Sequence, residues 1–423
     1  MSQPFHKPGP KNPQQRTPQL TLPPVQRGRV ALGLTAAAAE GRLAMQVCQS
    51  CGAVQYPPRE ACHVCLDADL RWRDQPGTGT LLSATTLHHS NDPYFRDRLP
   101  WRLGMVQLDT GPSAMVHLHG DVPLPHTPDD RVRVRVIARL DRSGKAVLVA
   151  LPEQETPHMS DDPMLREMGS DPRHRKVLVT DGKSAVGRAL IEAFLAAGAD
   201  RIWAGVAEPW KDTAALHALA ERHPQITIVP LDLGQERSVT ELAGQTGGKV
   251  DILVNNAEVH RTAGISGRRG VDVARLEMEI NYFGLLRLAQ AFAPVLRARA
   301  ADGPAHATAW VNVLSIFALA NWPTQGTFSA SKAAAHSLAQ ALRAELRAGG
   351  IHVLNAYPGP LDDEWNQPLP PPKLAPAALA SAIVKALRDG VEDIYPGDVA
   401  QDWLARWRDN PKVLEREIAA GGL

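Results

Sequence analysis

Lys176-Val-Leu-Val-Thr-Asp-Gly-Lys-Ser-Ala-Val-Gly187 is the stretch of this 423-residue sequence that decides the fold of its larger part. The apolar run at its start predicts a buried strand, and the spacing of apolar residues from Val186 to Ala197 predicts a helix. The loop between them, Thr180–Gly187, contains glycines at the point where a strand leads into a helix. Such a loop can place an anionic pyrophosphate at the helix N-terminus, but on its own it is a weak signal.

Short apolar segments alternate with helical segments after this loop. Strands are expected at 201–206, 226–231, 252–254, 310–314 and 351–356. Alternation of strands and helices predicts an α/β, doubly wound, Rossmann-type parallel sheet. We assign this domain to residues 176–423.

The composition excludes several classes of protein. A net charge of +1, from 46 basic and 45 acidic side chains, gives no overall field toward nucleic acid or anionic membranes. No run approaches the roughly 18 apolar residues of a membrane span, and the N-terminus lacks the apolar core of a signal peptide. We therefore expect a cytoplasmic protein without a membrane partner.

The N-terminal part divides into a leader, a small domain and a linker. Residues 1–26 are predicted to be disordered, because they are rich in proline and basic residues and contain no acid: Pro4, Lys7, Pro8, Pro10, Lys11, Pro13, Arg16, Pro18, Pro23 and Pro24. A short helix is expected at 32–43, and the polar segment 153–175 is expected to be an irregular linker. The domain between them covers residues 27–152.

All four cysteines lie in two C-x2-C pairs, Cys48-Gln-Ser-Cys51 and Cys62-His-Val-Cys65. Cytoplasmic thiols stay reduced, so disulfides are not expected. Four thiolates at this spacing can close a tetrahedron around a structural zinc, which leaves no open position for catalysis. His63 is expected to be an exposed spacer, and a redox dithiol is disfavoured because there are two pairs.

Five short strands follow the cysteines, at 81–87, 103–108, 114–119, 131–140 and 146–151. Five strands in about seventy residues suit a small β-barrel such as an OB-fold. An OB-fold can bind single-stranded nucleic acid, and Arg133, Arg135, Tyr94, Phe95 and Trp101 could serve that purpose. The near-zero net charge makes nucleic acid the weaker alternative.

The order of motifs in this region resembles a known family. Gly41-Arg-Leu43, the first cysteine pair, Tyr56-Pro-Pro-Arg59, the second pair, Trp72 and Gly77-Thr-Gly-Thr80 follow the pattern of zinc-ribbon/OB proteins that accompany thiolases and related acyl-CoA enzymes. The resemblance covers residues 30–152. It implies that this part binds or docks acyl-CoA carriers and braces a thiolase- or aldolase-type partner.

The C-terminal part resembles the short-chain dehydrogenase/reductase family. Motifs of that family follow the loop in order: Asp232-Leu233, Asn255-Asn-Ala257, Asn281, Ser315, Ser329-Ala-Ser-Lys332 and Pro358-Gly359. Two further stretches, Glu392–Pro396 and Pro411–Glu415, also recur in members of the family. The resemblance covers residues 175–420 and implies the Rossmann-type fold and dimerisation through the helices around Asn281 and Lys332.

The resemblance also implies roles for individual residues. The residues expected to contact a dinucleotide are Thr180, Gly182, Ser184, Ala185, Val186, Gly187, Asp232, Leu233, Asn256, Ala257, Lys332, Pro358 and Gly359. Glu208 suits a ribose 2′-hydroxyl, so NAD is weakly favoured over NADP, while Lys183 points the other way. Ser315 would orient the substrate carbonyl, Asn281 would hold a relay water, and Lys332 would depress the pKa of a catalytic tyrosine.

Three residues depart from the family pattern. Phe328 stands at the tyrosine position, thirteen residues after Ser315 and four before Lys332. Its ring cannot exchange the proton that accompanies hydride transfer, a role that contributes roughly 10²–10⁴-fold to catalysis. Asp181 replaces the first glycine of the loop, and Glu258 replaces the glycine that ends the Asn-Asn-Ala motif.

These observations lead to one hypothesis and two alternatives. The hypothesis is an accessory protein associated with acyl-CoA. Its degenerate dehydrogenase-like domain would partner a thiolase- or aldolase-type enzyme in lipid or steroid side-chain metabolism. The first alternative is an active NAD(P)-dependent oxidoreductase acting on a 3-hydroxyacyl- or 3-oxoacyl-CoA, with a relocated acid. Tyr282 and Tyr357 are weak candidates for that acid, because core neighbours are expected for both. The remote alternative is a nucleic-acid binder. If the dehydrogenase-like domain has no activity, Ser315 and Lys332 could have only structural roles.

Overall fold

The computed structural model describes residues 2–9, 14, 20–24, 27–125, 127, 130–211, 213–261, 264–267, 269–302, 309–367, 369 and 371–421. Of the predicted disordered leader, residues 1–26, the structure describes 2–9, 14 and 20–24, and these form no helix or strand; the rest of the leader lies outside the described residues. The chain forms two compact units, Thr21–Ser170 with Arg388–Val391 and Asp171–Leu387 with Glu392–Leu423, and a few N-terminal residues group with each. Among the described residues, no helix is both long and apolar enough to cross a membrane.

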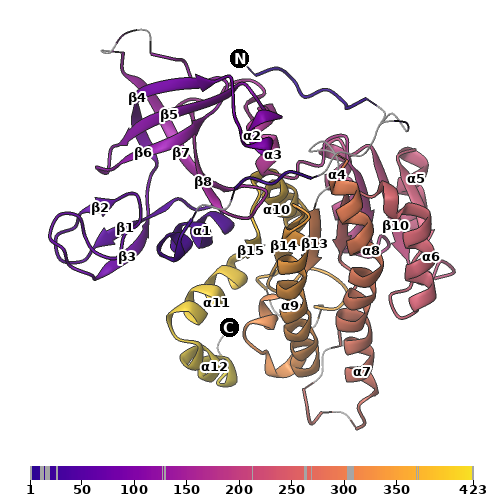
Figure 1. The fold of residues 1–423 in the computed structure, drawn as a ribbon. Helices are drawn as coiled ribbons and strands as arrows, with labels where there is room; N and C mark the ends of the chain where they lie inside the picture. Colours follow the sequence, from indigo (N-terminus) through magenta and orange to yellow (C-terminus); the bar gives the residue numbers. More distant parts are fainter. Residues whose placement is uncertain are drawn as a thin grey trace. The chain divides into compact units, whose positions relative to one another are not determined.

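The first unit begins with short helices and a three-stranded antiparallel sheet of order β2-β1-β3 (Figure 1). Its elements are η1 (Arg29–Ala31), α1 (Leu32–Ala39), β1 (Ala44–Cys48), β2 (Val54–Gln55) and β3 (Leu70–Asp74). The helix expected to reach residue 43 ends at Ala39. Gly41 then adopts a φ of +75°, a conformation that glycine takes without steric cost, and turns the chain into β1.

A closed five-stranded barrel of order β4-β5-β6-β8-β7 follows. Its elements are β4 (Thr78–Leu87), α2 (Pro93–Arg96), β5 (Trp101–Leu108), β6 (Ser113–Leu118), β7 (Val132–Leu140) and β8 (Ala146–Pro152). Alternate residues of β7, including Val134 and Val136, point into an aliphatic core, as the strict alternation of that segment predicts. Four register pairs from Thr78↔Arg135 to Leu81↔Val132 close the barrel, which confirms the OB-fold prediction.

The segment 153–175 is not irregular throughout. It contains η2 (Met159–Asp161) and α3 (Pro163–Met168). The Asp162 side chain accepts a hydrogen bond from the backbone of Met164 at 2.9 Å, and Met164 and Met168 pack on Trp101 and the end of β8. An N-cap followed by proline and two apolar residues four apart therefore forms a short helix here.

The second unit is a seven-stranded parallel sheet of order β11-β10-β9-β12-β13-β14-β15. Its strands are β9 (Lys176–Val179), β10 (Arg201–Val206), β11 (Ile226–Pro230), β12 (Ile252–Asn255), β13 (Ala309–Val313), β14 (His352–Ala356) and β15 (Asp393–Ile394). The order reverses between β9 and β12, which is the doubly wound arrangement that the sequence predicts. The two-residue strand β15 was not predicted.

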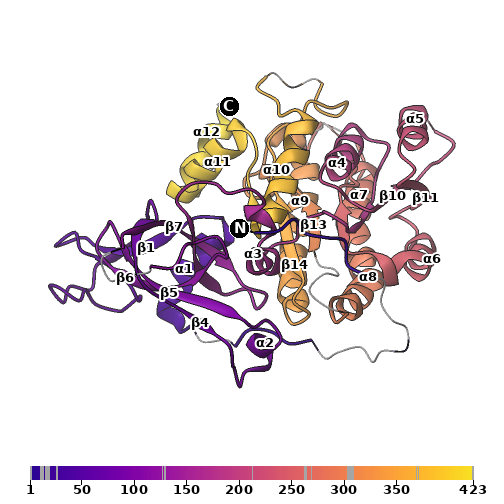
Figure 2. The ribbon, with the colours of Figure 1, turned by 90° about the horizontal axis from the view of Figure 1, so that it is seen from above.

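Helices cover both faces of this sheet, and two further helices, α11 (Asp398–Asp409) and α12 (Pro411–Ala419), pack on each other beside it. The other helices of the unit are α4 (Ala185–Ala196), α5 (Ala214–Arg222), α6 (Glu236–Thr246), α7 (Asp272–Met278), α8 (Leu285–Ala300), α9 (Gly326–Arg347) and α10 (Pro376–Asp389). Shorter turns are η3 (Gly247–Lys249), the π-helix η4 (Glu279–Gly284), η5 (Ile316–Ala318) and η6 (Pro323–Gln325). Figure 2 shows α4, α5 and α10 on one face and α6 and α8 on the other.

The core of the second unit explains why the strands read as continuous apolar runs. Both faces of β13 are buried, and its Trp310 is fully buried against α8 and α9. Every strand except the edge strands is covered by helices on both faces. Side chains that carry chemistry can therefore lie only where the strands end.

Candidate functional site

The four cysteines form the first candidate site. The Cys48 and Cys65 sulfurs lie 3.5 Å apart, the Cys51 and Cys62 sulfurs lie 3.6 Å apart, and all four lie within 4.8 Å of one another. A tetrahedron with zinc–sulfur bonds of about 2.3 Å has sulfur–sulfur edges of about 3.8 Å. The cluster therefore fits a structural zinc with four protein ligands.

Backbone groups favour the thiolate of Cys62, whereas at Cys65 the neighbouring sulfurs outweigh a backbone group and raise the pKa. The N–H groups of Cys65 and Val64 lower the pKa of the Cys62 thiol to about 6. Gly52 adopts a φ of +74° after the first pair, and its N–H donates to the Cys48 carbonyl. His63 points to Gln55, with 3.2 Å between its Nδ1 and the amide oxygen, and is not part of the sulfur cluster.

The second candidate site lies at the carboxyl ends of β9 and β12, where the strand order reverses. The loop after β9 is tied to the segment after β12 through Thr180, whose hydroxyl accepts from the backbone of Asn256 at 3.0 Å and of Ala257 at 2.9 Å. The Asn256 amide donates to the carbonyl of Asp181 at 2.8 Å and accepts from its N–H. These bonds fix the loop that the sequence predicts to contact a pyrophosphate.

The helix after the loop begins in the expected way. Ser184 is the N-cap of α4, and its hydroxyl accepts from the backbone of Gly187 at 3.0 Å. A Cβ at Gly187 would lie only 1.8 Å from the carbonyl oxygen of Asp181, so the loop and helix approach more closely than any other residue allows. Ala185 and Val186 form the first turn of the helix, and Gly182 packs on Ala204 of β10.

Asp181 lies in this same loop. Burial is the largest influence on its carboxyl group and raises the pKa of Asp181 above its ordinary value, although the charge of Lys183 and nearby backbone N–H groups favour the ionised form. The loop therefore adds a carboxyl group where the family motif has glycine.

Lys332 lies in α9 and is buried, with 3% of its side chain exposed. Its ammonium donates to the carbonyl of Val313 at 3.1 Å and lies 2.7 Å from the carboxylate of Glu258. The side chain of Glu258 is 16% exposed. The residue that breaks the Asn-Asn-Ala-Gly pattern is therefore the ion-pair partner of the lysine that the family uses.

Phe328 is buried one turn before Lys332 and stacks on His260. The ring centroids are 3.8 Å apart and the planes differ by 9°. His260 is 2% exposed, and its Nδ1 lies 4.0 Å from the carboxylate of Glu258. Burial lowers the pKa of His260, so this imidazole is neutral near pH 7.

Two buried polar side chains in this cluster, His260 and Gln325, face each other without a well-aligned hydrogen bond. Neither ring nitrogen of His260 and neither polar atom of Gln325 has a hydrogen-bond partner of good geometry among the described residues. Sequence reasoning missed both residues. The only signal for His260 was its position two residues after Glu258 in the same segment.

Asn281 lies in the π-helix η4, a distortion frequently found at functional sites. Its amide donates to the carbonyl of Val259 and to the hydroxyl of Ser331, and its oxygen accepts from the backbone of Val259 at 2.9 Å. Ser331 in turn donates to the carbonyl of Phe328. Asn281 thus connects the segment that follows β12, which contains Glu258 and Val259, to α9.

The remaining predicted residues lie around this centre. Ser315 is buried at the end of β13, and its hydroxyl accepts from the backbone of Phe317 at 3.2 Å. Asp232 caps its own turn by accepting from Gly234, while Leu233 packs in the core. Glu208 lies 2.7 Å from Lys211 and 3.9 Å from Lys183, so its charge is already paired.

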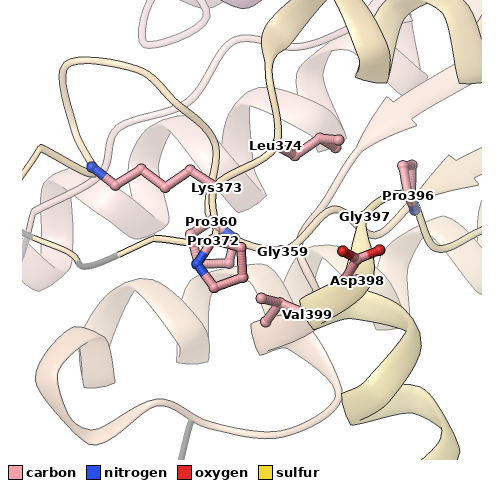
Figure 3. A pocket seen from close by; sticks show the side chains of 9 residues that line it. All are labelled: Gly359, Pro360, Pro372, Lys373, Leu374, Pro396, Gly397, Asp398 and Val399. Atoms are coloured by element: carbon pink, nitrogen blue, oxygen red, sulfur yellow. The ribbon is translucent and has the colours of Figure 1, made fainter.

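Pro358 and Gly359 follow β14. The carbonyl of Pro358 accepts from the backbone of Ile316, and Gly359 borders a pocket of about 150 Å³. Figure 3 shows prolines around this pocket, the carboxylate of Asp398 at the start of α11, and the ammonium of Lys373 directed away. The pocket is small and has few polar groups facing it.

Neither alternative tyrosine reaches the cluster of Glu258, His260 and Lys332. The hydroxyl of Tyr357 pairs with Nδ1 of His336 at 2.8 Å, and its buried ring stacks on Tyr395. Burial raises the pKa of Tyr357 further above its ordinary value. Tyr282 packs edge-on against Phe283.

Comparisons with known proteins agree with this architecture. Residues 35–71 match a family described as "ChsH2, rubredoxin-like zinc ribbon domain", residues 72–136 match "ChsH2, C-terminal OB-fold domain", and residues 175–373 match "short chain dehydrogenase". These matches follow the order of the structural units.

Relatives of the second unit are dehydrogenases. A 1-deoxy-11-beta-hydroxypentalenate dehydrogenase of Streptomyces exfoliatus is 32% identical over 213 residues, which is 47% of this chain and 72% of that protein. An SDR family protein 7-like dehydrogenase/reductase of Anopheles gambiae is 33% identical over 43% of this chain, and the match spans only 58% of that relative.

Solved structures give the same result. A short chain dehydrogenase from Burkholderia cenocepacia, in complex with NADP, is 31% identical with a TM-score of 0.52, and the match covers 59% of this chain and 98% of that one. A short-chain dehydrogenase from Streptomyces avermitilis is 26% identical with a TM-score of 0.50, and the match covers 57% and 96%. By its C-terminal domain the chain belongs to the short-chain dehydrogenase family, joined in one polypeptide to a ChsH2-type zinc ribbon and OB-fold.

Proposed function

We propose that this chain is an accessory subunit of an enzyme that acts on acyl-CoA thioesters, and that its dehydrogenase-like domain does not reduce carbonyls. The observation that carries the proposal is Phe328. Its buried ring occupies the family's tyrosine position and stacks on His260, while Lys332 is held by Glu258. Reduction of a carbonyl needs a proton for the oxygen as well as a hydride for the carbon, and a phenyl ring has no proton to give.

The first unit supports the accessory role. A ribbon and OB barrel of the ChsH2 type suggests a thiolase- or aldolase-type partner and an acyl-CoA ligand. The barrel exposes Leu82, Met105 and Met115, and Met105 lies directly opposite Met115 in the β5–β6 pair. Exposed apolar side chains grouped on one face are typical of a docking surface.

The barrel is poorly suited to single-stranded nucleic acid. Tyr94 and Trp101 are buried, with 3% and 7% of their surfaces exposed, so they cannot stack on bases. Arg133 forms two hydrogen bonds with the carboxylate of Asp109, at 2.8 and 2.7 Å. These contacts favour the acyl-CoA proposal over the nucleic-acid alternative.

One observation favours the second candidate, an active oxidoreductase with a relocated acid. His260 is the titratable side chain that lies against the Phe328 ring, and Glu258 and Lys332 lie beside it. In that case an imidazole would replace the tyrosine as proton donor. His260→Phe would then abolish turnover, whereas under the main proposal there is no turnover to lose.

A turnover assay separates the two candidates. Purified protein with NADH or NADPH and a panel of 3-oxoacyl-CoAs is expected to show no oxidation above background. Robust oxidation by the wild-type protein, lost in His260→Phe, would establish the oxidoreductase instead.

Co-expression tests the accessory role directly. The chain is expected to co-purify with a thiolase-type protein from the same genome, and Met115→Asp is expected to abolish capture. Asp substitution of the exposed Val413 on α12 is the matched control and should leave capture intact. Failure to retain any of the thiolase- or aldolase-type proteins of that genome would overturn the proposal.

A further inference from the structure

A dinucleotide in a doubly wound sheet binds outside the carboxyl ends of the strands, where the strand order reverses. In this chain that place lies after β9 and β12. The cofactor brings a pyrophosphate, which needs free N–H groups at the start of the first helix, and ribose hydroxyls, which need charged or polar side chains. The described residues can be tested against these needs.

The ammonium group at this place, that of Lys332, already has partners within the chain. Lys332 is buried, and its ammonium lies 2.7 Å from the Glu258 carboxylate and 3.1 Å from the Val313 carbonyl. A ligand that needed this ammonium would have to displace a carboxylate whose side chain is only 16% exposed. Displacement would leave Glu258 buried without its cation, and unpairing a buried ion pair is strongly unfavourable.

The loop before α4 carries a further carboxyl group. Asp181 stands in it next to Gly182, and the N–H of Gly187 in the first turn of α4 already donates to the Ser184 hydroxyl at 3.0 Å. A pyrophosphate at this turn would meet both a side chain where the motif has glycine and, when Asp181 is ionised, a like charge.

The other nearby cations have partners within the chain. The guanidinium of Arg188 donates to the carbonyl of Lys183, and that of Arg261 donates to the carbonyl of His260. Lys183 lies 3.9 Å from Glu208, which also pairs with Lys211. The site therefore offers an anionic ligand several carboxyl groups and no unpaired lysine among those described.

We propose that two carboxyl groups of the chain exclude a dinucleotide from this site: the carboxylate of Glu258 takes the place of cofactor oxygens at Lys332, and Asp181 adds a side chain and a like charge where the phosphate-binding loop has glycine. The residues present do not fit NAD or NADP, and the domain keeps the fold without the cofactor. This inference deepens the proposed function, because it explains a dehydrogenase-like domain that is retained as a structural partner.

Calorimetric titration with NADPH and with NADH tests the inference without any substrate. The wild-type protein is expected to show no saturable binding. Glu258→Gly with Asp181→Gly, which restores glycine at both positions, is expected to bind at least about tenfold more tightly than either single variant. Glu241→Gln is the matched control, because Glu241 forms an exposed pair with Arg237 at 2.6 Å.

Two results would overturn the inference. One is micromolar binding by the wild-type protein, and the other is a folded double variant that binds no better than the control. If the double variant does not fold, Glu258→Gln with Asp181→Asn removes both charges at nearly constant volume, and dinucleotide must then raise its melting temperature but not that of the wild-type protein. Failure here leaves partner capture and turnover unaffected, so it is distinguishable from failure of the proposed function.

Discussion

The cysteine cluster and the site at the carboxyl ends of β9 and β12 are both built from short loops that join regular elements, but they differ in which ligand-binding groups are still available. In the ribbon, all four sulfurs lie within 4.8 Å of one another, and among the described residues no other potential ligand is grouped with them. At the ends of β9 and β12, the framework bonds of Thr180, Asn256 and Asn281 are present, but the groups that would face a ligand are replaced or paired.

This difference shows what sequence motifs report. Thr180 and Asn256 hold the loop to the neighbouring strand, and Asn281 holds the Glu258 segment to the π-helix. These residues maintain the fold with or without a cofactor. Phe328, Glu258 and Asp181 would face the reaction, and they are the residues that differ. A family motif can therefore be retained for its structural bonds after its chemistry is lost.

The largest expected effect concerns the ribbon. Removal of zinc by a chelator, or Cys62→Ser, should unfold residues 44–74, since structural zinc contributes on the order of 10–16 kcal/mol in small zinc domains. Hydrogen exchange should show lost protection in β1–β3 with β9–β14 unchanged. Metal analysis should find a single zinc per chain before treatment, and unchanged protection after complete chelation would contradict the structural role.

The next effect concerns the ion pair between Glu258 and Lys332. Glu258→Gln leaves the Lys332 ammonium buried without its carboxylate, which should lower the free energy of unfolding of the second unit by about 3–5 kcal/mol. Adding Lys332→Met should recover much of this loss, and denaturant titrations of the four proteins give the coupling energy. The pair Arg237–Glu241 serves as control, because it is exposed and Glu241→Gln is expected to leave the stability unchanged. A coupling energy near zero would show that the pair does not form in solution.

The third effect is a pH dependence of the stability of the barrel, which contains a largely buried histidine. Burial, together with the charge of Arg27, lowers the pKa of His117 to about 4, and Trp101 donates to its Nδ1 at 2.8 Å. The unfolded chain, with a pKa near 6.5, binds the proton first, so stability should fall by about 3 kcal/mol as the pH drops from 6.5 to 4. His117→Asn keeps an acceptor without titrating, and its unfolding profile should be flatter. Equal profiles would contradict the burial of a neutral imidazole.

The smallest effect is expected for His260→Phe. The ring stacks on Phe328 and makes no hydrogen bond of good geometry, so an apolar ring should keep the packing and change stability by less than about 1 kcal/mol. Because burial lowers the pKa of His260, the wild-type protein should also lose stability below pH 6.5, and the variant should lose less. A loss of several kcal/mol in His260→Phe would indicate a polar partner for the imidazole and strengthen the oxidoreductase alternative.

Much of the fold could be predicted because each element has a local signature. The alternation in Val132–Leu140 and the apolar runs of β9–β14 specify a barrel strand and buried parallel strands. The predictions of secondary structure were wrong where one or two residues determine where an element begins or ends. Gly41 ends α1 early, Asp162 and Pro163 start a helix in the expected linker, and β15 has only two residues.

The candidate site was predictable only in part. Phe328, Asp181 and Glu258 stand out because they break motifs that can be read along the chain. The pairing of Glu258 with Lys332 and the stacking of His260 on Phe328 are contacts between distant segments, set by how α9 packs against the end of β12. No local pattern encodes such contacts, so the sequence identified the altered positions but not what they do.

The most direct test of the account is the rate of NADPH oxidation with 3-oxoacyl-CoA substrates, measured for the wild-type protein and for a triple variant that combines Phe328→Tyr, Glu258→Gly and Asp181→Gly. The account predicts background oxidation by the wild-type protein. It predicts a gain of roughly 10²–10⁴-fold in the triple variant, because the proton donor returns, Lys332 is freed and the loop regains its glycine. Wild-type oxidation as fast as that of the triple variant would contradict it.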